Sequence, residues 1–141
     1  MRKLLIGLAI VVVLLSACGG GTTPDPTVMT VTVEGGKCTY SGPTTVTAGT
    51  ITVNWNIVGQ NHDKYGLAIV TLDEGKTFED LDAWPSVGKP PWAELLAFRE
   101  KSTEGHTTVE TNVTKGPFFM VCFTAYPEKK AEVLGPVDVE G

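Results

Sequence analysis

Residues 50–57 read Thr-Ile-Thr-Val-Asn-Trp-Asn-Ile, and their strict alternation decides the fold class. Ile51, Val53, Trp55 and Ile57 fall on one side, whereas threonine and asparagine fall on the other. Side chains along a β-strand alternate between the two faces of the sheet, so a period of two indicates that one face is buried. The segment therefore predicts a half-buried strand of an antiparallel sheet.

Further strand-like segments lie on both sides of residues 50–57, with glycine, serine and proline turn signals between them. The predicted strands cover residues 28–34, 37–40, 44–47, 66–72, 107–113, 118–125 and 132–139. The run 66–72 is almost continuously apolar, which indicates a strand covered on both faces. In 118–125, Phe119, Val121 and Phe123 share one face, and Phe118, Met120 and Cys122 share the other.

Residues 73–105 have a different pattern, which we interpret as helical. Thr77 is a predicted N-cap, and the acidic residues that follow it suit the positive end of the helix dipole. Pro85 is expected to end this helix, and Pro90-Pro91 to open a second short helix that runs to about Arg99. Seven or eight short strands interrupted once by helices predict an all-β domain, a β-sandwich, over residues 28–141.

The carboxyl-terminal half resembles the end of a cupredoxin. The matching segments are 116–122 (GPFFMVC), Pro127 and 134–139 (LGPVDV), and earlier 43–57 (PTTVTAGTITVNWNI) and 66–70 (GLAIV). In that family a strand ending in cysteine leads into a copper loop, and a last strand closes the sandwich. The resemblance implies a Greek-key cupredoxin-like β-sandwich with one short helical insertion.

The copper ligands of that family do not carry over to this chain. A blue-copper centre uses two histidines, a thiolate and usually a weak axial methionine. Cys122 falls at the thiolate position, but Tyr65 and Gly66 stand where the first histidine is expected, and Leu134 falls near the axial position. Residues 123–128 contain no second histidine. The resemblance therefore implies a sandwich without a cofactor.

A nonclassical copper site is the alternative for a metal or redox protein. It would use Cys122 with His62, His106 or Met120, although nothing in their spacing requires that they meet. Both histidines follow polar loop residues, and a solvated loop histidine is the favoured interpretation of each.

The amino end has the three parts of a secretory signal. Arg2 and Lys3 precede the uncharged run 4–15, and 15–18 (LSAC) resembles the bacterial lipobox. Cys18 is the predicted lipid attachment site, 1–17 the signal peptide, and 18–27 a lipidated flexible tether. An uncleaved anchor and ordinary secretion are the alternatives, but the run is shorter than the roughly 20 residues of a membrane-spanning helix. We expect a lipoprotein held extracytoplasmically at the cell membrane or the outer membrane.

Assigning Cys18 to lipid leaves Cys38 and Cys122 as an even pair. In an oxidising compartment such a pair is most simply a disulfide, although the sequence does not give the distance between the two residues. A bridge that closes so long a loop would stabilise the domain by about 4–5 kcal/mol on the chain-entropy model.

Charge and motif content argue against several classes of function. Without residues 1–17, nine basic residues remain against 16 acidic ones, which gives a net charge of −7. Nucleic-acid binding needs clustered lysine and arginine, which this chain does not have, so we expect no such partner. The chain also carries no Gly-Lys-Ser/Thr phosphate loop, no H-E-x-x-H and no G-x-S-x-G, and we expect no enzyme.

Trp84 and Trp92 flank a proline-rich bend. They are either packed onto the sandwich or displayed as an aromatic binding surface for a protein or a carbohydrate. The sequence thus predicts a non-catalytic binding module tethered to a membrane through its lipid.

Overall fold

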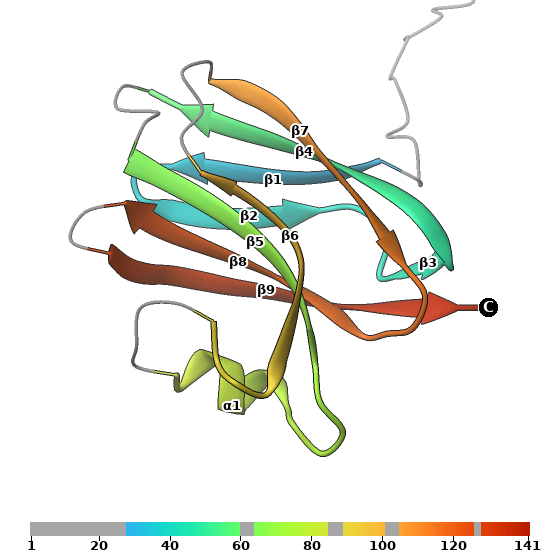
Figure 1. Cartoon of the computed structure of the whole chain (residues 1–141). Coiled ribbons are helices and arrows are strands. Elements are labelled where there is room, and N and C mark those ends of the chain that lie inside the picture. The colour runs from blue at the N-terminus through green and yellow to red at the C-terminus, as the bar shows by residue number, and fades with distance from the viewer. Residues whose placement is uncertain (1–27, 60–63, 85–88, 101–104, 126–127) are drawn as a thin grey trace, which may run out of the picture.

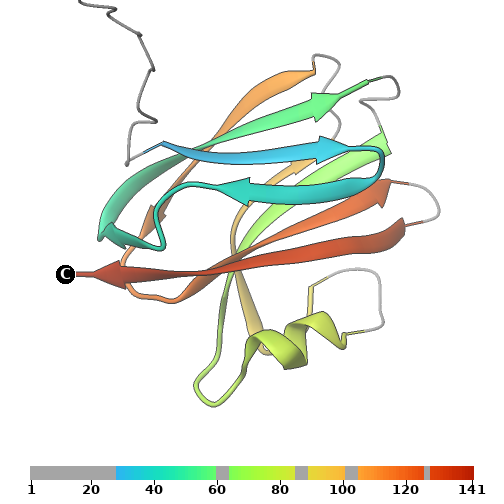
Figure 2. The ribbon, with the colours of Figure 1, turned by 180° about the vertical axis from the view of Figure 1, so that it is seen from behind.

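The structure is a computed structural model that describes residues 28–59, 64–84, 89–100, 105–125 and 128–141. Within these ranges, nine strands and one short helix form two facing sheets (Figures 1 and 2). The elements are β1 (Met29–Glu34), β2 (Lys37–Ser41), β3 (Thr45–Thr47), β4 (Gly49–Val58), β5 (Tyr65–Leu72), α1 (Phe78–Asp82), β6 (Ala93–Glu100), β7 (His106–Val113), β8 (Phe118–Ala125) and β9 (Glu128–Glu140). The prediction of an all-β sandwich is confirmed.

The strands are ordered β2-β1-β4-β7 in one sheet and β3-β9-β8-β5-β6 in the other. The decisive segment forms β4, which is antiparallel to β7 but parallel to β1. β3 and β9 make a second parallel pair. The prediction that residues 50–57 belong to an antiparallel sheet therefore holds for the pairing of β4 with β7 and is wrong for its pairing with β1. The chain crosses to the other sheet for β3 and returns for β4, so β4 enters beside β1 in the same direction.

The main core lies between the two sheets. Trp55, at the middle of β4, is the largest fully buried side chain, and the other inward residues of β4 are buried with it. The buried members of this core are Met29, Val31, Val33, Cys38, Ile51, Val53, Trp55, Ile57, Leu67, Ile69, Val109, Val113, Phe118, Met120, Cys122 and Val137. Full burial of a large apolar side chain contributes about 1.5–3 kcal/mol, so the alternating strands supply the main driving force.

β5 is covered on both faces, as its continuous apolar run predicted. Leu67 and Ile69 belong to the main core, whereas Ala68 and Val70 belong to a second cluster on the outer face of the five-stranded sheet. Leu81 of α1 packs into this second cluster. The helix therefore covers the face of the five-stranded sheet that points away from the four-stranded sheet (Figure 1).

Residues 93–100 form β6, so the second helix predicted to run to about Arg99 was wrong. The segment Ala-Glu-Leu-Leu-Ala has good intrinsic helix propensity. In the fold it pairs antiparallel with β5 instead, with a register shift opposite Ile69 and Val70. This pairing supplies hydrogen-bond partners to backbone groups of β5 that a helix would leave without them, and it outweighs the local preference. The first helix ends at Asp82, and Pro85 lies outside the described residues.

Side-chain hydrogen bonds connect the two sheets at both edges of the sandwich. At one edge the hydroxyl of Thr111 in β7 donates to the carbonyl of Leu96 in β6, at 2.9 Å. At the other edge, where β2 and β9 face each other, Glu132 bonds to the backbone of Cys38. Both contacts therefore connect the two sheets at the edges of the sandwich.

Candidate functional site

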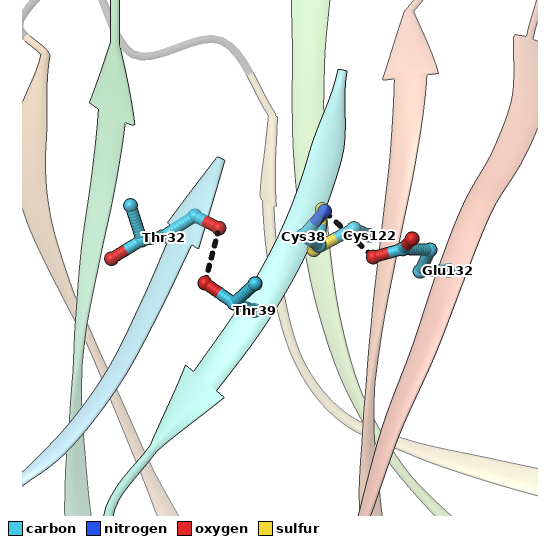
Figure 3. The surroundings of a disulfide bond; sticks show 5 residues. All are labelled: Thr32, Cys38, Thr39, Cys122 and Glu132. Carbon is cyan, nitrogen blue, oxygen red and sulfur yellow. Dashed lines mark hydrogen bonds between the residues drawn. A yellow bond between two sulfur atoms is a disulfide. The ribbon is translucent and has the colours of Figure 1, made fainter. Parts of the chain in front are cut away.

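Cys38 and Cys122 form a disulfide, as the cysteine count predicted (Figure 3). Their Cα atoms lie 6.5 Å apart, and 84 residues separate them in the sequence. Cys38 is on β2, at the edge of the four-stranded sheet, and Cys122 is on β8 in the other sheet. The bond therefore joins the two layers, and its cysteines are only 2% and 0% exposed.

Glu132 stands beside this disulfide. In the β8–β9 hairpin it is the register partner of Cys122, so both side chains are on the inward face of the sheet. One of its carboxylate oxygens accepts the backbone N–H of Cys38 at 2.7 Å (Figure 3). This contact could not be predicted from the sequence, because 94 residues separate the donor from the acceptor.

The four residues of the alternative copper site do not come together among the residues that the structure describes. The sulfur of Cys122 is bonded to Cys38, and Met120 is fully buried in the main core. His106 is exposed at the start of β7 and shares a hydrogen bond with the amide oxygen of Asn56. His62 lies outside the described residues. Within the described ranges, no three His, Cys, Asp or Glu side chains converge to hold a metal ion.

Trp84 and Trp92 contact each other edge to face, with ring centroids 5.9 Å apart. Trp92 also packs against the second cluster on the outer face of the five-stranded sheet. Both residues are half-buried, and the indole N–H of Trp84 is buried without a hydrogen-bond partner among the described atoms. The pair is thus both packed and partly displayed, so neither of the two sequence interpretations describes it alone.

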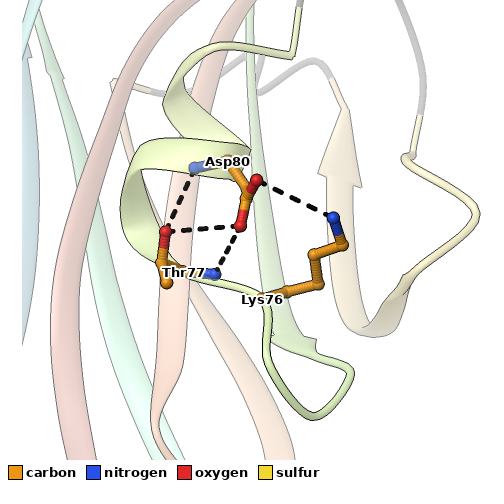
Figure 4. A network of polar contacts seen from close by, with 3 residues as sticks. All are labelled: Lys76, Thr77 and Asp80. Atoms are coloured by element: carbon orange, nitrogen blue, oxygen red, sulfur yellow. Dashed lines mark hydrogen bonds and ion pairs between the residues drawn. The ribbon is translucent and has the colours of Figure 1, made fainter.

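The local structure at the start of α1 places the ammonium group of Lys76 over the ring of Trp92. Thr77 caps the helix: its hydroxyl accepts the N–H of Asp80, and the Asp80 carboxylate accepts the N–H of Thr77 at 3.0 Å (Figure 4). This is the predicted N-cap, completed as a capping box. Lys76 forms an ion pair with Asp80 at 3.7 Å, and its ammonium group lies 5.1 Å from the centroid of the Trp92 ring. The capping residue Asp80 therefore also helps to hold the cation over the Trp92 ring.

A second aromatic pair, which was not predicted from the sequence, lies on the five-stranded sheet. Phe98 of β6 and Phe123 of β8 stack with their rings nearly parallel, 5.4 Å apart between centroids, on the outer face of the sheet. They reach over β5, where the ring of Phe123 occupies the space that a Cβ on Gly66 would take. Phe98 is 49% exposed, and nearby Leu95 on the same strand is 44% exposed. The pair could not be predicted while the segment up to about Arg99 was expected to be a helix, because only the strand β6 brings Phe98 beside Phe123.

The predicted signal peptide, Cys18 and the tether lie outside the described residues. Among the residues that are described, no helix has the length and apolar character needed to cross a membrane. Neither a family model nor a curated protein sequence matches the chain.

Proposed function

We propose that the mature protein is a lipid-anchored extracytoplasmic binding module without catalytic activity. The single observation that carries this proposal is the Cys38–Cys122 disulfide. Buried disulfides persist in oxidising compartments and are rare in the bacterial cytosol. The bond therefore agrees with export, which the sequence pattern ending at Cys18 also predicts.

We further propose that the domain is a Greek-key sandwich of the cupredoxin-like type. A Greek key has the spatial order 4-1-2-3. The strands β8-β5-β6-β7 follow this order if β7, at the edge of the other sheet, is counted as the neighbour of β6. β8 pairs with β5, β5 with β6, and the contact between Thr111 and Leu96 brings β7 beside β6. The motif 116–122 ends in the middle of β8, and the resemblance assigns Cys122 to the position of the family's thiolate.

Binding is favoured over copper chemistry because the one retained ligand of the family has another use. A disulfide sulfur is not a thiolate, and soft metal ions are held by thiolates. The domain would then use the sandwich as a rigid support and contact its partner through side chains on its surface.

We assign the binding surface to Trp84 and Trp92, with Lys76 above the Trp92 ring. Their mutual contact already orders both rings, so binding loses little side-chain entropy. Aromatic rings with one edge in solvent are effective anchors for protein or carbohydrate partners.

Cell fractionation tests the anchor. The wild-type chain is expected in the membrane fraction of the producing bacterium, and Cys18→Ala is expected to lose this association. Ser41→Ala is the control, because it changes an exposed residue of the domain and should leave both the fold and the anchor intact. If Cys18→Ala fractionates with membranes as the wild type does, the lipid assignment is wrong.

Thiol titration and copper loading test the metal-free assignment. The purified mature protein is expected to contain no free thiol in denaturant and to retain no stoichiometric copper after Cu²⁺ loading and desalting. Two reactive thiols together with one tightly held copper ion would instead support a redox protein that uses Cys122.

Site-specific photocrosslinking in cells tests the surface. A photoreactive phenylalanine analogue at position 84 or 92 is expected to yield adducts of defined mass, whereas the same analogue at exposed Thr45 on β3 is not. Equal adduct patterns at all three positions would contradict the assignment.

A further inference from the structure

The side chain of Glu132 is a charged neighbour of the disulfide. Glu132 projects from β9 toward both cysteines: it is the register partner of Cys122, and its carboxylate accepts the N–H of Cys38. In Figure 3 the dashed line joins the Glu132 carboxylate to the N–H of Cys38, the residue whose sulfur is bonded to Cys122. The Glu132 carboxylate therefore contacts the backbone of Cys38, and Glu132 itself is the cross-strand neighbour of Cys122.

No cation balances this carboxylate among the side chains that the structure describes. The ion pair of Lys76 and Asp80 is the one salt bridge among them, and it lies at the start of α1. Lys37 precedes Cys38 in the sequence, but its side chain is on the exposed opposite face of β2. A glutamine could accept the same hydrogen bond, so the hydrogen bond alone does not require a negative charge at this position.

Negative charge has a specific effect on thiol–disulfide exchange. An incoming thiolate attacks one sulfur, the S–S bond breaks, and the second cysteine departs as a thiolate, which leaves a mixed disulfide. A second external thiolate then resolves the mixed disulfide, so that two thiols are oxidised and the protein pair is reduced. Both the attacking group and the leaving group are anionic, and the Glu132 carboxylate repels each of them.

We propose that Glu132 protects the Cys38–Cys122 bond against exchange with small and protein thiols. Burial hinders the approach of a thiol, and the carboxylate adds an electrostatic barrier at the edge between β2 and β9. The protection is strongest against thiols that carry further negative charge. This inference concerns the disulfide alone, and it holds or fails independently of what the surface of the domain binds.

The experiment compares reduction by two small thiols of opposite charge, cysteamine and 3-mercaptopropionate. The full chain is purified in a non-ionic detergent, and the appearance of free thiols is followed by alkylation and mass spectrometry. The quantity compared is the cysteamine rate constant divided by the 3-mercaptopropionate rate constant, each referred to the thiolate concentration. A change in stability alters both rates alike, so the ratio isolates the effect of charge.

Glu132→Gln retains a hydrogen-bond acceptor and is expected to lower this ratio on the order of tenfold at low salt, in line with the interaction of unit charges a few ångströms apart near a protein surface. Glu132→Asp keeps the charge and should stay close to the wild type. Glu110→Gln removes an exposed carboxylate from β7 and should not change the ratio.

An unchanged ratio in Glu132→Gln overturns the proposal, and so does an equal decrease in Glu110→Gln. A bond that is reduced only through global unfolding gives one ratio in all the proteins, which also overturns it.

Discussion

The Glu132 carboxylate accepts the backbone N–H of Cys38 across the edge of the sandwich, at 2.7 Å. This contact and the Cys38–Cys122 bond connect the edge strand β2 to the five-stranded sheet, the first through the backbone of Cys38 and the second through its side chain. β2 is only five residues long and has one strand neighbour, β1, so these two ties matter more for β2 than for a central strand.

Removing the disulfide should strongly destabilise the domain. For Cys38→Ala combined with Cys122→Ala, the free energy of unfolding should fall by about 4–5 kcal/mol, because the unfolded chain is no longer constrained by a loop of more than eighty residues. Urea denaturation measures the loss. Addition of reductant should destabilise the wild type by a similar amount and leave the double variant unchanged. A wild-type transition that does not respond to complete reduction would contradict the structural role of the bond.

Gly66 should tolerate no side chain while Phe123 is present. A Cβ at this position would overlap the ring of Phe123, so Gly66→Ala should destabilise by about 1–3 kcal/mol through overpacking. In a Phe123→Ala background the same substitution should cost far less, and urea denaturation of all four proteins gives the coupling energy. Additive effects would mean that the two residues do not compete for this space.

Tyr40 should make the stability depend on pH in the alkaline range. Burial raises the pKa of Tyr40 from 10.0 to about 12, and its hydroxyl donates to the carbonyl of Pro43. The folded state therefore keeps a proton that the unfolded state loses, and the stabilisation is complete below pH 10 and lost as the pH rises toward 12.

Tyr40→Phe removes the titrating group and the hydrogen bond. The variant should be less stable than the wild type at pH 8, and the difference should shrink between pH 10 and pH 11.5 in urea denaturation series. A constant difference across this range would show that Tyr40 titrates alike in the folded and unfolded states.

Local periodicity was sufficient to predict most of the strands. The alternation around Trp55 and the continuous apolar run of β5 both report which faces are buried, and the fold buries those faces. Thr77 was recognisable as an N-cap because capping depends on residues within one turn. The Cys38–Cys122 pair followed from counting cysteines once Cys18 had been assigned to lipid, without any knowledge of distance.

The features that were missed depend on contacts between distant residues. β6 has the composition of a helix, and only its pairing with β5 makes it a strand. The aromatic pair of Phe98 and Phe123 exists because β5 brings Gly66 between their strands. In the sequence Glu132 cannot be distinguished from other charged residues, because only the pairing of β8 with β9 places it beside Cys122.

The central claim is that one cysteine carries lipid while the other two form a disulfide in an exported domain. The most direct test is the intact mass of the protein extracted from membranes and alkylated in denaturant without reductant. The account predicts a chain that begins at Cys18, carries the mass of attached acyl chains, and takes up no alkylating reagent. A chain that retains residues 1–17, or one that is alkylated at Cys38 and Cys122, would contradict it.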